Sequence, residues 1–148
     1  MSISCEHSVD VSCSPEQAFA LLDDLPRTSE WLGPCTAIEK LTAEPNAVGQ
    51  KMKYHYEQGG QKGVMDGTIL ARVPNEKLTC EYYDKMMQVV VDFNVSRLPS
   101  GSRLKHVITI TPKTFFSKLM TPLIRMSLPK QTHQAMAALK SILESGKS

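Results

Sequence analysis

The feature of this 148-residue sequence that most constrains its fold is a long series of strand and turn signals, followed by a helical segment without turns. Between residues 36 and 112, short stretches of alternating polar and apolar residues are separated by turn sequences such as Pro74-Asn75-Glu76. Such alternation is typical of strands with one buried face, and short turns join neighbouring strands antiparallel. We therefore predict a meandering antiparallel sheet, with strands over 36–41, 51–57, 64–73, 77–83, 86–98 and 103–111 and a hairpin tip at 59–63.

The segment before this sheet predicts one more strand and two short helices. Residues 3–11 alternate, which places five side chains on one face: Ile3, Cys5, His7, Val9 and Val11. Ser14 is a good helix N-cap, Pro15 suits the first helical position, and Gln17 stands in capping-box register with the serine. Pro26 ends this helix, and a second short helix is predicted over 27–32.

The last third of the chain predicts helix. Between residues 114 and 145 there is no hairpin signal, and seven apolar residues recur at helical spacing: Phe115, Leu119, Leu123, Met126, Met136, Leu139 and Leu143. Pro122 and Pro129 predict a kink or a break near each, and 130–144 should be an uninterrupted helix with Gly146 past its end. An amphipathic helix must bury its apolar face, and the sheet is the surface that the chain offers.

These elements predict an α+β fold and a single domain over residues 1–148. A sheet of six to seven strands twists and curls, so its concave face does not fit flat against one helix. We expect large side chains to fill the gap in part and a cavity to remain between the sheet and the C-terminal helix. The phase of the strands after Val64 is not fixed by the pattern, so the residues that line this cavity stay open at this point.

Composition and charge exclude several classes of protein. Hydrophobic residues make up 41% and charged residues 22%, which excludes a disordered or collagen-like chain. The net charge of +2 is spread along the chain, so we expect no nucleic-acid partner. The sequence has no signal peptide and no apolar run of the ~20 residues that a membrane span needs, which favours a cytoplasmic protein. Its four cysteines form no CxxC pair, so we expect reduced, buried thiols and no metal.

The sequence resembles the START-related (SRPBCC, birch-pollen-allergen-type) superfamily over nearly its whole length. The residues that carry the resemblance are Val9, Ser14-Pro15, Ala18-Phe19, Leu22, Asp24, Trp31, Ile38, Leu41, Gly49, Pro74-Asn75, Leu78, Leu139-Lys140 and Leu143. Among its members, the chain is most similar to the small bacterial polyketide cyclase/dehydrase-like proteins. The resemblance implies a helix-grip fold, in which the sheet grips the C-terminal helix and leaves a tunnel. It also implies an apolar ligand such as a sterol, lipid, polyketide, plant hormone or quinone, and some members are cyclases or hydrolases.

Several residues are candidates for contact with such a ligand. We expect ligand contact from three tyrosines, the tryptophan and two methionines: Trp31, Tyr54, Tyr56, Tyr82, Met126 and Met136. His7 and His106 share faces with apolar residues, so both are candidates for a general base in the cavity, with a buried structural histidine as the alternative. The orientation of His133 is ambiguous. No serine-hydrolase, metalloprotease or nucleotide-binding motif is present, and we expect no cofactor.

Three functions remain open from the sequence. The first is binding of an apolar small molecule. The second is an enzyme of cyclase, dehydrase or isomerase type, with a cavity histidine and a tyrosine. The third is a protein–protein interaction module with a filled core. The apolar, methionine-rich segment 115–128 is also a candidate lid or membrane-touching surface, and the sequence does not determine the oligomeric state.

Overall fold

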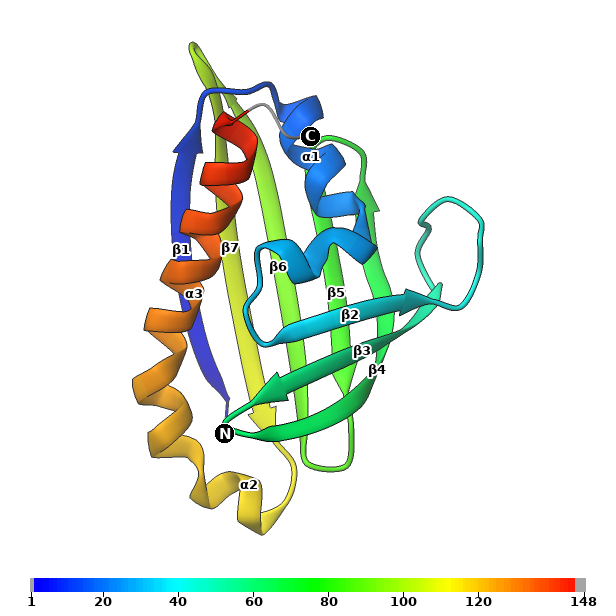
Figure 1. Ribbon diagram of the computed structural model, residues 1–148, viewed down its shortest axis with the longest axis vertical. Coiled ribbons are helices and arrows are strands. Elements are labelled where there is room, and N and C mark those ends of the chain that lie inside the picture. Colours follow the sequence, from blue (N-terminus) through cyan, green and yellow to red (C-terminus); the bar gives the residue numbers. More distant parts are fainter. Residues whose placement is uncertain (1, 146–148) are drawn as a thin grey trace.

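The computed structural model describes residues 2–145, which form one seven-stranded antiparallel sheet and a set of helices (Figure 1). The first elements are strand β1 (Ile3–Val11), helix α1 (Pro15–Asp23) and the 3₁₀ helix η1 (Leu25–Glu30). The remaining strands are β2 (Cys35–Lys40), β3 (Lys51–Gln58), β4 (Gln61–Val73), β5 (Lys77–Tyr83), β6 (Met87–Leu98) and β7 (Gly101–Pro112). Helices α2 (Phe115–Leu119) and α3 (Thr121–Glu144) follow. The predicted α+β fold, with a curved sheet and a long C-terminal helix, is confirmed.

Local sequence signals account for the first elements. In β1 the side chains alternate between an outer face, which is exposed, and an inner face, whose ends Ile3 and Val11 are buried. The predicted capping box forms at the start of α1: the Ser14 hydroxyl accepts from the Gln17 backbone N–H, and the Gln17 side chain accepts from the Ser14 N–H. The second predicted helix is the 3₁₀ helix η1, which begins two residues earlier than expected.

The sheet is a meander closed at one edge by the first strand. Its strand order is β1-β7-β6-β5-β4-β3-β2, and every pair is antiparallel. Consecutive strands from β2 to β7 are therefore neighbours, and β1 pairs with β7. The β3–β4 turn is tighter than predicted, since Gly59 and Gly60 alone form it with φ values of 60° and 81°. Two consecutive residues with positive φ are typical of a type I′ hairpin turn, which glycine adopts without strain.

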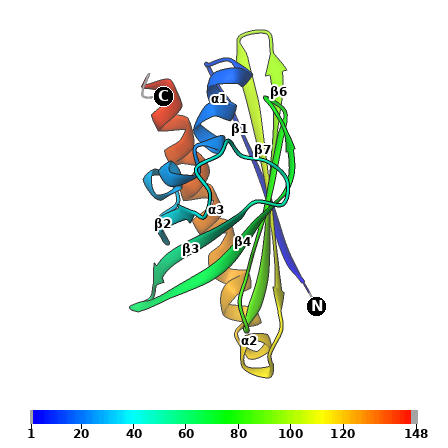
Figure 2. The same cartoon turned by 90° about the vertical axis from the view of Figure 1, so that its right-hand side faces the viewer.

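Helices α1 and α3 lie on the concave side of the sheet, and α2 lies at one end of the strands (Figure 2). Helix α3 runs along β1 at one edge of the sheet, α1 lies across β5, β6 and β7, and η1 packs on β2 (Figure 1). Buried residues of α3, among them Met136 and Leu139, join the main hydrophobic core together with Phe19 and Leu22 of α1. No helix in residues 2–145 is long and apolar enough to cross a membrane.

The prolines of the C-terminal segment act differently from each other. Pro122 stands in the first turn of α3, directly after the break at Met120 that separates α2 from α3, as predicted. A break or kink is also predicted near Pro129. The structure shows no break there, because α3 continues through this residue. Leu128 and Thr132 are both buried, so tertiary packing holds the helical turns on either side of the proline. Gly146 lies outside the described residues.

The prediction that one apolar stripe of the C-terminal segment faces the sheet is wrong for its first half. Met136, Leu139 and Leu143 are buried as expected. The others are mostly exposed: Phe115 78%, Leu119 61%, Leu123 58% and Met126 79%. Figure 1 shows the reason, because α2 and the first turns of α3 lie at the end of the molecule beyond the last residues of β7.

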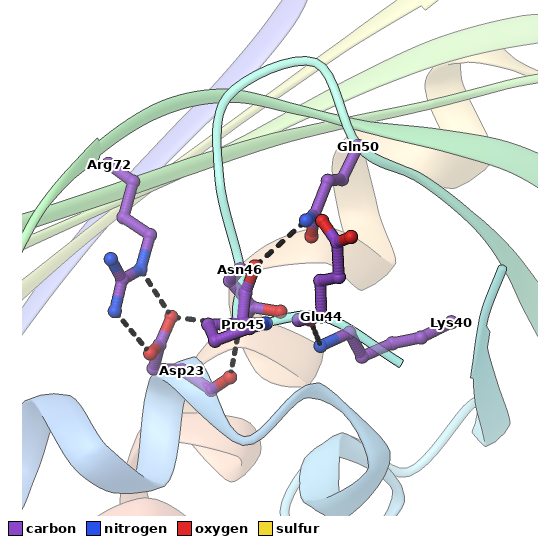
Figure 3. Close-up of polar contacts among 7 residues, drawn as sticks. All are labelled: Asp23, Lys40, Glu44, Pro45, Asn46, Gln50 and Arg72. Atoms are coloured by element: carbon purple, nitrogen blue, oxygen red, sulfur yellow. Dashed lines mark hydrogen bonds and ion pairs between the residues drawn. The ribbon is translucent and has the colours of Figure 1, made fainter. Parts of the chain in front are cut away.

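A half-buried ion pair ties the loop between β2 and β3 to the rest of the molecule (Figure 3). Arg72 on β4 donates two hydrogen bonds to the Asp23 carboxylate, at 2.9 and 2.7 Å. Asn46, in the loop, donates a third to Asp23 at 2.9 Å. Burial alone would raise the pKa of Asp23, but the hydrogen bonds from Arg72 and Asn46 outweigh this effect and lower the pKa below its usual value.

Replacing Arg72 with alanine should therefore cost about 1–3 kcal/mol of unfolding free energy, because it removes two charge-assisted hydrogen bonds from a half-buried carboxylate. Since the pKa of Asp23 is lowered on folding, this stabilisation is complete above the unfolded-state pKa of about 3.9 and is lost as the pH falls through the folded-state value. Urea denaturation from neutral to acid pH measures it. Arg97→Ala removes an exposed ion pair with Glu16 and is the control, with an expected cost below about 0.5 kcal/mol. Equal costs for the two variants would contradict this account.

Candidate functional site

The concave face of the sheet is covered incompletely. The buried hydrophobic residues form two clusters, a main one under α1 and α3 and a small one of Ile3, Ile110 and Leu128. Between them lie five side chains that belong to the inner face and are only half-buried, which we name the inner strip: Cys5, Met87, Val89, Val91 and Ile108.

The pairing of the strands shows that the inner strip points inward. Val89 lies opposite Tyr82, and Val91 lies opposite Cys80; both of these partners are core residues. Ile108 lies between Val91 and Cys5. Directly paired residues share one face of a sheet, so these side chains face the helices and not the outer solvent. In Figure 1 the middle of β6 and β7 is visible between α3 and the β2–β3 pair.

A small apolar cavity, partly open to solvent, adjoins the inner strip at Val91. Its volume is about 40 Å³, and it lies between the sheet and the α1–η1 segment. Its walls come from both sides: Leu22, Leu25, Thr28, Trp31 and Leu32, and on the sheet Tyr54, Leu78, Cys80, Tyr82, Val91 and Phe93. No α3 residue lines it, so this cavity is not under the C-terminal helix, where we expected one. The reason is that α3 packs along β1 at the edge of the sheet, whereas the α1–η1 segment faces the cavity walls on β3, β5 and β6.

A row of three rings begins at the cavity; Trp31 and Phe93 line the cavity, and His106 does not. Trp31 meets Phe93 edge to face with 5.6 Å between centroids, and Phe93 stacks on His106 at 4.6 Å. Both outer members of this row carry a buried nitrogen without a hydrogen-bond partner among residues 2–145, namely Trp31 Nε1 and His106 Nδ1. Buried polar atoms in folded proteins are nearly always paired, so each of these two nitrogens lacks a partner that it would usually have.

Two of the predicted tyrosines line the cavity from the sheet side, as Phe93 does. Tyr54 and Tyr82 lie with their ring centroids 4.8 Å apart. Tyr82 packs on Gly67, where the Cβ of any other residue would come within 2.9 Å of its ring. Burial raises the pKa of both phenols, so their hydroxyls are protonated at neutral pH and can donate hydrogen bonds.

The predicted histidines lie side by side. His7 and His106 are directly opposite each other in the β1–β7 ladder, and His133 of α3 meets His7 edge to face at 5.1 Å. Burial disfavours the imidazolium of His106 and, together with nearby His7, lowers the pKa of His106 to about 4, against a weaker opposing effect of Asp92. His106 is therefore neutral at neutral pH, which makes it a weak base and a good hydrogen-bond partner.

The other predicted ligand-binding residues lie away from the cavity. Met136 is fully buried in the main core, and Met126 is 79% exposed, so the expectation that Met126 points inward is wrong. Tyr56 stacks on Tyr54 at 6.3 Å and also lines an open surface depression of about 410 Å³ near the β3–β4 hairpin, with Lys62.

The cysteines and the acidic residues give no further reactive centre. All four cysteines are free thiols. Burial raises the pKa of Cys35 to about 11 and of Cys80 to about 12, so neither is a thiolate at neutral pH. In the described part of the chain, no three His, Cys, Asp or Glu side chains are grouped so that they could hold a metal ion.

Sequence reasoning missed Phe93 and the three residues of the inner strip that lie on β6, and it left the orientation of His133 open. Val89, Val91 and Phe93 occupy alternate positions of β6 and so share one face of the strand. Knowing which face of β6 points inward would have identified all three. The contact between His7 and His133 depends on how α3 lies against β1, for which the sequence carries no local signal.

The low pKa of His106 predicts a pH-dependent stability. Between about pH 6.5 and pH 4 the unfolded chain binds a proton at this histidine and the folded chain does not, so unfolding becomes easier as the pH falls. The expected loss is on the order of 3 kcal/mol. His106→Leu should flatten this part of the stability profile in urea denaturation, while Val95→Ala, at a buried residue that does not titrate, should leave the slope of the profile unchanged. Parallel profiles for the wild type and His106→Leu would refute the assignment.

Several solved structures share this fold at low sequence identity. A START superfamily protein from Mycobacterium smegmatis aligns with a TM-score of 0.79 and 15% identity, over 96% of this chain and 97% of that one. The protein TTHA0849 from Thermus thermophilus aligns over 100% of both chains with a TM-score of 0.74 and 13% identity. The di-domain ARO/CYC protein StfQ of the steffimycin biosynthetic pathway aligns with a TM-score of 0.76 and 12% identity, over 99% of this chain and 52% of that one.

At sequence identities of 12–15%, the structural similarity shows a shared fold only. This fold is the helix-grip fold of the START proteins. No curated protein matches the chain. The protein family described as "Polyketide cyclase / dehydrase and lipid transport" matches residues 2–144, which is nearly the whole chain. The chain thus has the fold of a START-type ligand-binding domain and belongs to the polyketide cyclase / dehydrase and lipid transport family.

Proposed function

We propose that this chain binds an apolar small molecule, such as a lipid, quinone or polyketide, on the inner strip and in the cavity that adjoins it. The observation that carries the proposal is the half-exposure of the inner strip. Apolar side chains on the inner face of a sheet are normally covered, and each Å² left in water costs about 25 cal/mol. A ligand that covers the inner strip regains this free energy.

The unpaired polar atoms indicate one chemical feature of the ligand. The indole Nε1 of Trp31 can only donate, and it is buried without a partner on the wall of the cavity. A carbonyl or hydroxyl oxygen of the ligand would satisfy it. This favours an oxygen-bearing ligand over a pure hydrocarbon.

The size of the cavity indicates how the ligand lies. Binding pockets for small molecules usually measure about 300–1,000 Å³, far more than the 40 Å³ present here. Only one end of a lipid or ring system fits into the cavity, so the rest extends along the inner strip from Val91 toward Met87. A protein-binding role with a filled core, the third function open from the sequence, would need no such half-covered inner face.

A second candidate is catalysis of the cyclase or dehydrase type, favoured by the buried, unpaired Nδ1 of His106 beside His7. A neutral imidazole at this place could orient a carbonyl, and the half-buried His7 could take a proton from the adjacent carbon. This function rests on binding and adds a chemical step to it. His7→Leu would then abolish conversion of a bound ketone while leaving its affinity unchanged.

Filling the inner strip should block binding. Val89→Trp places a large ring on the strip, and we expect at least about a tenfold loss of affinity for 8-anilinonaphthalene-1-sulfonate in a fluorescence titration, because the ring occupies the surface that the probe would cover. Val90→Trp is the matched control, since Val90 lies on the outer face of the same strand, opposite Glu81 and Thr109.

Solvent extraction of the purified protein, followed by mass spectrometry, identifies any ligand that it carries. A stoichiometric oxygen-bearing lipid or ring compound, lost in Val89→Trp and kept in Val90→Trp, is the expected result. Equal probe binding by the two variants, with nothing extracted from either, would contradict the proposal.

A further inference from the structure

The exposed apolar residues of α2 and the start of α3 form a surface of their own, which we name the end patch. It consists of Phe115, Phe116, Leu119, Leu123 and Met126, all between 58% and 79% exposed. Other exposed large hydrophobic residues, such as Leu41 and Leu70, are scattered over several strands and loops. Phe115 and Leu119 are four residues apart in α2, and Leu123 and Met126 are three apart in α3, so each pair shares one helix face. A concentration of this kind marks an interaction surface.

The charged residues of α2 and of the first turns of α3 all have one sign. No aspartate or glutamate occurs between Asp92 and Glu144. Lys118, Arg125 and Lys130 are exposed, and none of them has a carboxylate partner among residues 2–145. Helix α1 differs, since it carries Glu16 and Asp23. Apolar side chains interspersed with unpaired cations are complementary to a partner that has an anionic outer layer over an apolar interior.

We propose that the end patch docks on the surface of a bilayer that contains anionic phospholipids. The apolar side chains would enter the boundary between headgroups and acyl chains, and Lys118, Arg125 and Lys130 would meet the phosphates. Each exposed Leu or Phe contributes roughly a tenfold gain in affinity when it leaves water. The helices lie on the membrane and do not cross it.

A second copy of this chain is a poorer occupant of the end patch. A symmetric dimer would place the patch against itself, and its three unpaired cations would then face the same cations of the partner without any carboxylate between them. An anionic lipid surface supplies the missing negative charge.

The position of the end patch links it to the proposed ligand site. Ile124, next to Leu123 on α3, is half-buried against the small core cluster beside Met87, Val89 and Ile108. The same turn of α3 therefore faces the membrane with one side and the end of the inner strip with the other. Docking on the bilayer does not depend on the proposed ligand-binding function. Transfer of an apolar ligand from the bilayer to the inner strip rests on that function.

Co-sedimentation with vesicles tests the docking. The protein should bind vesicles of phosphatidylcholine with phosphatidylserine, bind those of phosphatidylcholine alone more weakly, and be released by high salt. Leu123→Asp/Met126→Asp should weaken binding at least about tenfold. Leu41→Asp is the matched control, since Leu41 is 53% exposed and lies outside the patch, while Leu123 is 58% exposed. Lys118→Glu/Arg125→Glu should lose the preference for anionic vesicles, and Lys118→Arg/Arg125→Lys should keep it.

Three results would overturn the proposal. The first is no sedimentation of the wild type with either vesicle, and the second is equal loss of binding in Leu123→Asp/Met126→Asp and Leu41→Asp. The third is a dimer in analytical ultracentrifugation that Leu123→Asp/Met126→Asp dissociates, because the patch would then bind a second copy. Circular dichroism of each variant confirms that it is folded. A variant that no longer sediments with vesicles is also titrated with 8-anilinonaphthalene-1-sulfonate. If it still binds this probe, docking has failed while the ligand site is intact.

Discussion

The arrangement of this molecule depends on the packing of α3 along β1, at one edge of the sheet. Seven strands at about 4.8 Å spacing extend roughly 29 Å across, whereas a helix with its side chains is about 10–12 Å wide. One helix therefore leaves more than half of the concave face open. Helix α1 covers part of β5, β6 and β7, and η1 packs on β2 at the opposite edge. Asp23, Arg72 and Asn46 tie α1, β4 and the loop after β2 together. The inner strip is what remains between the two covers.

The chemistry of the site follows from this division. Under η1 the cover is tight and leaves a small apolar cavity, while toward α3 it is loose and leaves apolar side chains half-exposed. Few polar groups reach the interior, and burial keeps them neutral: the pKa of His106 falls and the pKa values of Tyr54 and Tyr82 rise. A neutral interior with unpaired donors and acceptors suits a ligand that is mostly apolar and carries an oxygen atom.

Much of the fold could be predicted from the sequence because its signals are local. The alternation of β1, the Ser14 capping box and the glycine turn after β3 each depend on a few adjacent residues. The part of the inner strip on β6 could not be predicted. Val89, Val90 and Val91 are consecutive, so both faces of the strand are apolar there and the pattern does not show which face points inward. For a related reason, helical spacing predicts that four of the five end-patch residues pack on the sheet, and it leaves a lid or membrane-touching surface as the alternative. Helical spacing shows that a helix has an apolar face but does not show what covers that face.

The central claim is that an apolar ligand with an oxygen atom lies on the inner strip and accepts a hydrogen bond from Trp31. Since Trp31 is the one tryptophan in the sequence, its indole N–H gives a single resonance in a nitrogen–proton NMR spectrum. Titration of the labelled protein with the ligand extracted from it, or with 2-naphthol in its absence, should move this resonance downfield and shift the methyl signals of Val89, Val91 and Ile108. A static indole signal, with shifts only at Leu119, Leu123 and Met126, would place the ligand on the outer surface and contradict the claim.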